Sequence, residues 1–120
     1  MSERVTVKHV DEFEHPWPNW ILCRKGLGLS AFGMNIAELA PGQQIPEHDE
    51  VARDQEEVFV TLSGAPTIVV DGEPFPAPEG TFVRLDPEPR RFARNDGEGI
   101  ARVLILSAPR SSGYEPMDWA

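Results

Sequence analysis

Residues 42–64 read GQQIPEHDEVARDQEEVFVTLSG, a polar stretch that runs directly into a strand-like pattern. Side chains of a β-strand point alternately to its two faces. One face of this segment carries Glu57, Phe59, Thr61 and Ser63, and the other carries Val58, Val60 and Leu62. If Glu57 faces the interior, the Val and Leu face needs a cover, which a second sheet, the N-terminal strands or another subunit can supply. This requirement favours a homodimer.

Outside this stretch, short apolar runs alternate with turns. The chain has 12 prolines and 10 glycines, which separate the apolar runs at intervals of roughly eight to twelve residues, a spacing typical of all-β folds. No segment has a convincing helical pattern. The expected strands are 5–10, 20–24, 32–39, 57–63, 66–70, 73–75, 81–85, 91–95 and 101–107. Between the fifth and sixth of these, Asp71-Gly72 predicts a type I′ hairpin, because both turn residues must accept positive φ.

Length and composition exclude several classes of protein. A chain of 120 residues predicts one domain, 1–120, with one core. Its net charge of -9 disfavours nucleic acid and anionic membranes as partners. We find no apolar run that resembles a signal peptide or a membrane span, so we expect a cytoplasmic protein. The single cysteine, Cys23, excludes an intramolecular disulfide and lies in an apolar context typical of a buried thiol.

Opposite charges are concentrated in different parts of the chain. An acidic set lies in the first half: Glu47, Asp49, Glu50, Asp54, Glu56 and Glu57. An arginine set lies in the C-terminal third: Arg84, Arg90, Arg91, Arg94, Arg102 and Arg110. We expect folding to bring the two sets together, mostly as loose surface pairs.

The opening stretch resembles the first signature motif of the cupin superfamily, G-x5-H-x-H-x3-4-E-x6-G. Gly42, His48, Glu57 and Gly64 occupy the matching positions. Glu50 stands where the second histidine is expected. Six residues rather than three or four separate Glu50 from Glu57.

A second stretch, GTFVRLDPEPRRFARN from Gly80 to Asn95, resembles the second cupin motif, G-x5-P-x-G-x2-H-x3-N, more weakly. Asn95 matches, but Arg91 replaces the histidine that is the fourth metal ligand in the family. Asp86 and Glu88 replace the proline and the inner glycine. Fifteen residues separate the two motifs, a spacing similar to that of small single-domain bacterial cupins.

The resemblance implies a double-stranded β-helix, or jelly-roll barrel, whose interior holds the site. His48, Glu50 and Glu57 are the implied metal ligands, for a divalent ion such as manganese, iron, nickel or zinc. Arg91, Phe59 and Thr61 are the implied ligand-binding residues. Arginine cannot bind a metal, because it stays protonated and only donates hydrogen bonds. Two main arrangements are therefore open: a three-ligand metal site with Arg91 beside it, or a metal-free site in which Arg91 pairs with a carboxylate. A metal set that includes Asp49 or Glu56 is a further alternative.

These arrangements correspond to two functions. In the first, the chain is a small-molecule-binding cupin or a metal-dependent enzyme, of isomerase or oxygenase type, that acts on a small organic acid. In the second, it is a metal-free module that binds or senses a metabolite, with a structural Arg–Glu pair. The sequence assigns no catalytic residue and does not identify the ligand.

Overall fold

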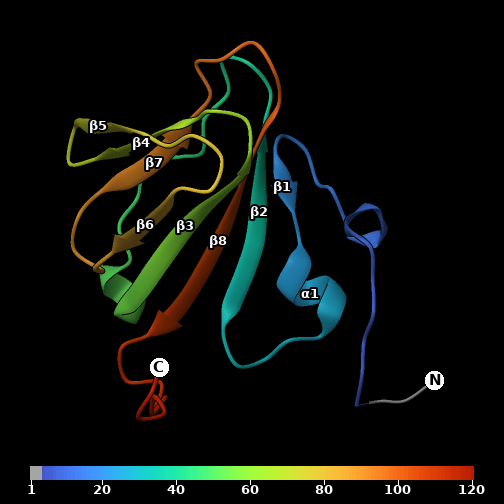
Figure 1. Ribbon diagram of the computed structural model, residues 1–120, viewed down its shortest axis with the longest axis vertical. Helices are drawn as coiled ribbons and strands as arrows, with labels where there is room; N and C mark the ends of the chain where they lie inside the picture. Colours follow the sequence, from blue (N-terminus) through green and yellow to red (C-terminus); the bar gives the residue numbers. More distant parts are fainter. Residues whose placement is uncertain (1–3) are drawn as a thin grey trace.

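The computed structural model describes residues 4–120 as two antiparallel sheets that enclose the core (Figure 1). One sheet has five strands in the order β1-β2-β8-β3-β6, and the other has three in the order β5-β4-β7. The strands are β1 Trp20–Ile21, β2 Gly33–Leu39, β3 Gln55–Ser63, β4 Thr67–Val70, β5 Glu73–Pro76, β6 Phe82–Leu85, β7 Arg91–Arg94 and β8 Ala101–Pro109. The helices are the short 3-10 turns η1 Val10–Glu12 and η2 Val51–Arg53 and the helix α1 Cys23–Leu27. The predicted all-β barrel is confirmed.

The main core lies between the two sheets. Phe59 from β3 and Val103 from β8 pack in one cluster with Ile68 from β4 and Ala93 from β7, all buried. Burial of a side chain such as Phe or Val contributes about 1.5–3 kcal/mol. On β3, Glu57 also points inward with Phe59, so the face assignment made from the sequence is correct.

The outer face of the larger sheet is covered only in part. Ile21, Cys23 and Ile36 form a second buried cluster there, beneath the N-terminal segment and α1. The N-terminal part of the chain therefore supplies one of the expected covers, but only over β2 and the adjoining part of β8. Burial raises the pKa of the Cys23 thiol, which agrees with an unreactive core cysteine.

Two expectations near the N-terminus are wrong. The strand expected at 5–10 does not form: residues 5–9 have no strand partner in the described structure, and Val10 begins the turn η1. Val7 stays exposed. The strand expected at 20–24 stops at Ile21, and Cys23–Leu27 forms the helix α1. Gly28 ends this helix in the left-handed conformation (φ 68°), and its N–H donates to the carbonyls of Arg24 and Lys25. Nowhere in residues 4–120 is a helix both long and apolar enough to span a membrane.

The Asp71-Gly72 hairpin is confirmed. Both residues have positive φ, 48° and 81°, and Val70 pairs with Glu73 across the turn. This is the geometry of a two-residue hairpin loop. It fixes the register of β4 and β5.

Folding also joins the acidic and arginine sets. Four arginines pair with the acidic set: Arg84 with Glu56, Arg90 with Glu47 and Asp49, Arg91 with Glu57, and Arg110 with Asp54. Arg94 and Arg102 pair instead with Asp96 and Glu38, which lie outside that set. Of these five pairs between the two sets, four are at the surface, and Arg91–Glu57 is buried.

Candidate functional site

The two motif segments are held together by backbone hydrogen bonds. The His48 N–H donates to the Arg91 carbonyl (3.1 Å), and the Arg91 N–H donates to the His48 carbonyl (2.8 Å). Gln44 forms a second isolated bridge with Arg94. The loop before η2 therefore runs along the free side of β7, and His48 lies opposite Arg91.

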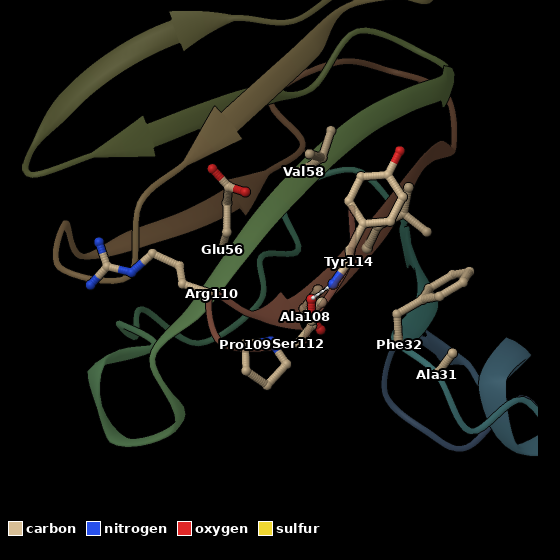
Figure 2. Close-up of a pocket in the computed structure, with 12 residues that line it drawn as sticks. Ala31, Phe32, Glu56, Val58, Ala108, Pro109, Arg110, Ser112 and Tyr114 are labelled. Carbon is tan, nitrogen blue, oxygen red and sulfur yellow. Dashed lines mark hydrogen bonds between the residues drawn. The ribbon is translucent and has the colours of Figure 1, made fainter. Parts of the chain in front are cut away.

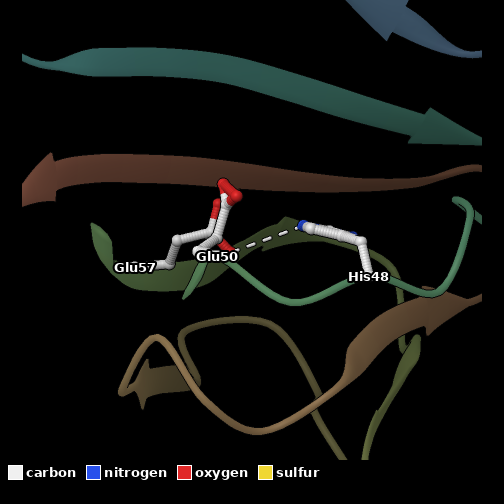
Figure 3. A group of neighbouring side chains, drawn as sticks. All are labelled: His48, Glu50 and Glu57. Atoms are coloured by element: carbon white, nitrogen blue, oxygen red, sulfur yellow. Dashed lines mark ion pairs between the residues drawn. The ribbon is translucent and has the colours of Figure 1, made fainter. Parts of the chain in front are cut away.

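The imidazole of His48 and the carboxylate of Glu57 converge (Figure 3). His48 Nε2 lies 3.7 Å from Glu57 Oε1, and His48 Nδ1 lies 3.0 Å from the Pro46 carbonyl oxygen. A carbonyl only accepts, so Nδ1 is the donor in that bond, and Nε2 faces Glu57. The Glu57 carboxylate beside it raises the pKa of His48, against an opposing effect of burial. The protonated imidazole is therefore favoured next to Glu57.

Glu50 reaches the same point in spite of the longer gap before Glu57. The extra residues form the turn η2, after which Asp54 adopts a left-handed conformation (φ 51°). The Gln55 N–H then donates to the Glu50 carbonyl (3.1 Å), which closes the loop. The Gln55 side-chain amide also donates to Glu50 Oε1 (3.1 Å) and orients that carboxylate.

The three side chains fit a divalent ion. Each of His48, Glu50 and Glu57 offers one ligand atom, and these atoms lie within 4.8 Å of one another. One imidazole nitrogen and two carboxylate oxygens are ligands suited to manganese, iron or zinc. The Pro46 carbonyl and Gln55 amide hold two of these groups in place, as partners of metal ligands commonly do.

Arg91 lies behind Glu57 and is fully buried, with 0% of its surface exposed. Its Nη1 is 3.7 Å from Glu57 Oε1, and its Nη2 donates to the Asp86 carbonyl. Within the described part of the chain, Arg91 Nε and Nη1 and Glu57 Oε1 have no hydrogen-bond partner. The structure thus has features of both the three-ligand metal site and the metal-free site. The atoms of His48, Glu50 and Glu57 converge, and Arg91 also faces Glu57.

A cavity of about 350 Å³ opens beside these groups. His48, Glu50 and Glu57 line it together with apolar and polar residues from other strands: Trp20, Met34, Asn35, Ile45, Pro46, Ile105 and Ser107. The sequence analysis missed Trp20, Asn35 and Ser107. Only the pairing of distant strands identifies such residues. Ser107, for example, is opposite Glu57 in the β3–β8 register, which the sequence does not reveal.

The three residues predicted to bind the ligand are Arg91, Phe59 and Thr61. Among the described residues, none of the three lines this cavity. Phe59 packs in the core, and the Thr61 hydroxyl donates to the Ala77 carbonyl (2.9 Å). Arg91 is sealed behind Glu57. Direct ligand contact by these three residues stays a prediction.

Asn95, the matching residue of the second motif, has a structural role. It is buried, and its amide donates to the carbonyls of Leu39 (2.8 Å) and Gly99 (2.7 Å). Its Oδ1 accepts a hydrogen bond from the Gly97 N–H (2.9 Å). Asn95 therefore ties the turn before β8 to the end of β2.

Comparison with known proteins agrees with this architecture. The family model for the Cupin domain matches residues 35–107, and the chain belongs to this family. A cupin protein from Bacteroides fragilis has a similar structure, with a TM-score of 0.73, 20% identity and coverage of 94% of each chain. A sugar phosphate isomerase of the cupin superfamily from Silicibacter pomeroyi has a TM-score of 0.72 and 19% identity over 86% of this chain and 75% of that chain.

A third similar structure is a predicted oxalate decarboxylase from Thermotoga maritima. It has a TM-score of 0.63 and 17% identity, with coverage of 74% of this chain and 76% of that chain. No curated protein matches the chain. At these identities, the structural likeness establishes the shared fold.

Proposed function

We propose that this cupin binds a small organic acid in the cavity through a divalent metal ion held by His48, Glu50 and Glu57. One observation carries the proposal. The buried Glu57 Oε1 has no hydrogen-bond partner among residues 4–120 and faces His48 Nε2 at 3.7 Å. An ion in this position satisfies both atoms and the nearby Glu50 carboxylate.

The charges of the site support an anionic ligand. Glu50, Glu57 and Arg91 together carry one net negative charge when His48 is neutral, and a divalent ion changes this to one net positive charge. Because Arg91 is sealed behind Glu57, the acid would meet the metal rather than the guanidinium. In this proposal Arg91 acts as a counter-charge that holds Glu57.

The bound metal would supply Lewis acidity, which serves isomerisation or oxygenation of a small acid. The chain's own residues bind and orient the ligand. Asn35 and Ser107 offer hydrogen-bonding groups on the β2 and β8 side of the cavity, and Trp20 and Ile105 offer apolar walls. Similar structures named as a sugar phosphate isomerase and a predicted oxalate decarboxylase support small-molecule chemistry in this fold.

The second candidate is a metal-free module that binds or senses a metabolite. The observation that favours it is the burial of Arg91 with its Nη1 3.7 Å from Glu57 Oε1, because this cation already compensates one carboxylate. In this case the cavity recognises its ligand by shape and hydrogen bonds alone.

Metal content separates the two candidates. We expect about one equivalent of manganese, iron, nickel or zinc in protein purified without chelator, or after reconstitution, measured by elemental mass spectrometry. The loss of one ligand in Glu50→Ala should abolish binding while keeping the Arg91–Glu57 pair. The exposed Glu56→Ala is the matched control and should retain the metal. Failure of the native protein to take up any of these ions would support the metal-free module.

We also propose a cytoplasmic protein whose partner is a small molecule rather than nucleic acid or a membrane. The net charge of -9 supports the choice of partner, because it repels phosphate backbones and anionic lipid surfaces. Electrophoretic mobility shift and liposome sedimentation should detect no binding at physiological salt.

A further inference from the structure

Two polar side chains on the wall of the cavity have no partner in the protein. Asn35 of β2 and Ser107 of β8 line the cavity together with the three candidate metal ligands. Within residues 4–120, neither the amide of Asn35 nor the hydroxyl of Ser107 forms a hydrogen bond. A few polar groups in a largely apolar pocket are what fix the orientation of a ligand. Both side chains are therefore available to a molecule in the cavity.

Strand register places these two groups on one side of Glu57. Ser107 is opposite Glu57 of β3 and opposite Gly33 of β2. Asn35 is opposite Ile105, two residues farther along the same inner face. Because neighbouring strands are about 4.8 Å apart, Ser107 lies one strand away from Glu57 and Asn35 lies two strands away. A molecule that is bound at Glu57 and extends across β8 would meet first Ser107 and then Asn35.

The hydroxyl of Ser107 points toward β2 because residue 33 is a glycine. A Cβ added at Gly33 would overlap with Ser107 Oγ. The hydroxyl thus occupies the space that a side chain at position 33 would fill. It lies on the Asn35 side of the cavity and forms no hydrogen bond with Glu57 in the described part of the chain.

No cation is available to a ligand in this cavity. Its described lining residues include neither lysine nor arginine. Arg91 is fully buried behind Glu57. Figure 2 shows Arg110 with Glu56 at a different hollow, a groove of about 720 Å³ on the outer face of the larger sheet. Arg110 is paired there with Asp54 (2.5 Å).

The charge of the site therefore limits the ligand to one anionic group. With a divalent ion, Glu50, Glu57 and Arg91 sum to one net positive charge, which a single ligand carboxylate neutralises. A second anionic group would lie in a partly enclosed cavity without a counter-charge, which is costly. A hydroxyl group avoids this cost and can form hydrogen bonds with a neutral amide and a neutral hydroxyl.

We propose that the cavity selects a small monocarboxylic acid that carries hydroxyl groups, which Ser107 and Asn35 bind while the metal takes the carboxylate. The inference rests on the proposed metal-bound acid and names its class. Dicarboxylates and phosphate esters are then poor ligands, although similar structures are named as a predicted oxalate decarboxylase and a sugar phosphate isomerase. The cavity volume of about 350 Å³ is near the lower end of the range for ligand sites, about 300–1,000 Å³, and suits a short chain.

Three four-carbon acids test the proposal: butanoate, 3,4-dihydroxybutanoate and succinate. Isothermal titration calorimetry on the metal-loaded full chain gives their affinities, and elemental analysis afterwards shows that the acids have not removed the metal. We expect 3,4-dihydroxybutanoate to bind about tenfold more tightly than butanoate, because two hydrogen bonds are added. Succinate should bind no more tightly than butanoate.

Variants of the two polar residues should change this preference. Ser107→Ala and Asn35→Ala should each weaken binding of 3,4-dihydroxybutanoate about threefold and leave butanoate unaffected. Ser111→Ala is the matched control, because Ser111 is exposed and lies outside the cavity. Asn35→Lys supplies the missing cation and should shift the preference toward succinate. Circular dichroism and metal content check that each variant folds and keeps the ion.

The outcomes separate this inference from the proposed function. If the metal-loaded protein binds succinate as tightly as 3,4-dihydroxybutanoate, the assigned class is wrong, but a metal-bound acid still stands. Equal losses for butanoate and 3,4-dihydroxybutanoate in the alanine variants would also overturn it, since the two residues would then only shape the cavity. A protein that takes up no metal, or a metal-loaded protein that binds none of the three acids, would overturn both.

Discussion

The guanidinium Nη1 of Arg91 lies 3.7 Å from Glu57 Oε1, and both side chains are buried. Arg91 stands where the second cupin motif has a histidine, and the backbone bridge to His48 keeps it at that position. A fixed cation therefore replaces a metal ligand. Glu57 lies between this cation and His48. Its carboxylate can therefore bind a metal ion together with His48 or pair with Arg91 in a metal-free site.

Replacing Arg91 by histidine should raise metal affinity. Arg91→His removes a positive charge and offers a fourth nitrogen ligand, so we expect zinc or manganese to bind about tenfold more tightly or better, a gain of about 1.4 kcal/mol. Isothermal titration calorimetry measures this directly. Arg84→His, at an exposed position, is the control and should leave the affinity unchanged. Unchanged affinity in Arg91→His would show that position 91 does not reach the metal.

Neutralising Glu57 should destabilise the metal-free protein. Glu57→Gln leaves the buried Arg91 without a counter-charge, which typically costs about 3–5 kcal/mol. Glu56→Gln breaks only the exposed pair with Arg84 and should cost less than about 1 kcal/mol. Urea unfolding with chelator present compares the two. Equal small losses would mean that Arg91 does not depend on Glu57.

The stability of the metal-free protein should depend on the protonation of His48. Its pKa is raised from 6.5, chiefly by Glu57, so the protonated form is favoured in the folded state. The resulting stabilisation is fully present below the unfolded pKa and is lost as pH rises through the raised folded pKa. The free energy of unfolding of the native protein minus that of His48→Gln should therefore be larger near pH ~6 than near pH ~9. A difference independent of pH would contradict the His48–Glu57 interaction.

Protons and metal should compete for the same atom. If the ion binds His48 Nε2, its affinity should fall as pH drops through the raised pKa of His48, because the imidazole must first lose its proton. Titration of zinc at a series of pH values measures this. An affinity that stays flat across that range would place the metal elsewhere.

The glycine that closes the first motif should be intolerant of a side chain. Gly64 has φ 80°, and an added Cβ would lie 2.8 Å from Ala101 Cα and 2.9 Å from the Ile100 carbonyl oxygen. Gly42 has a similar φ of 83° with nothing within 4 Å of an added Cβ. Gly42→Ala should cost about 1–2 kcal/mol for the left-handed backbone alone. Gly64→Ala should cost clearly more in thermal or urea unfolding, and equal losses would contradict the close approach of β3 and β8.

Local patterns in the sequence were sufficient to predict most strands. Alternation along EEVFVTLSG gave the correct inward face, and Asp71-Gly72 gave the hairpin, because both depend on neighbouring residues only. The strands expected at 5–10 and at 22–24 were wrong because they depend on contacts with distant parts of the chain. A strand requires a paired neighbour, and a five-residue helix is stabilised by packing of Cys23 against β2 rather than by its own sequence.

The sequence by itself determined the cupin family and the candidate ligands His48, Glu50 and Glu57, because motif spacing fixes where the chain turns and returns. Only the tertiary structure decided that Arg91 is sealed behind Glu57 and that Asn35 and Ser107 line the cavity. The cavity brings together side chains from β1, β2, β3 and β8, which are far apart along the chain. Their contacts depend on strand order and register between distant segments, and no local spacing encodes these.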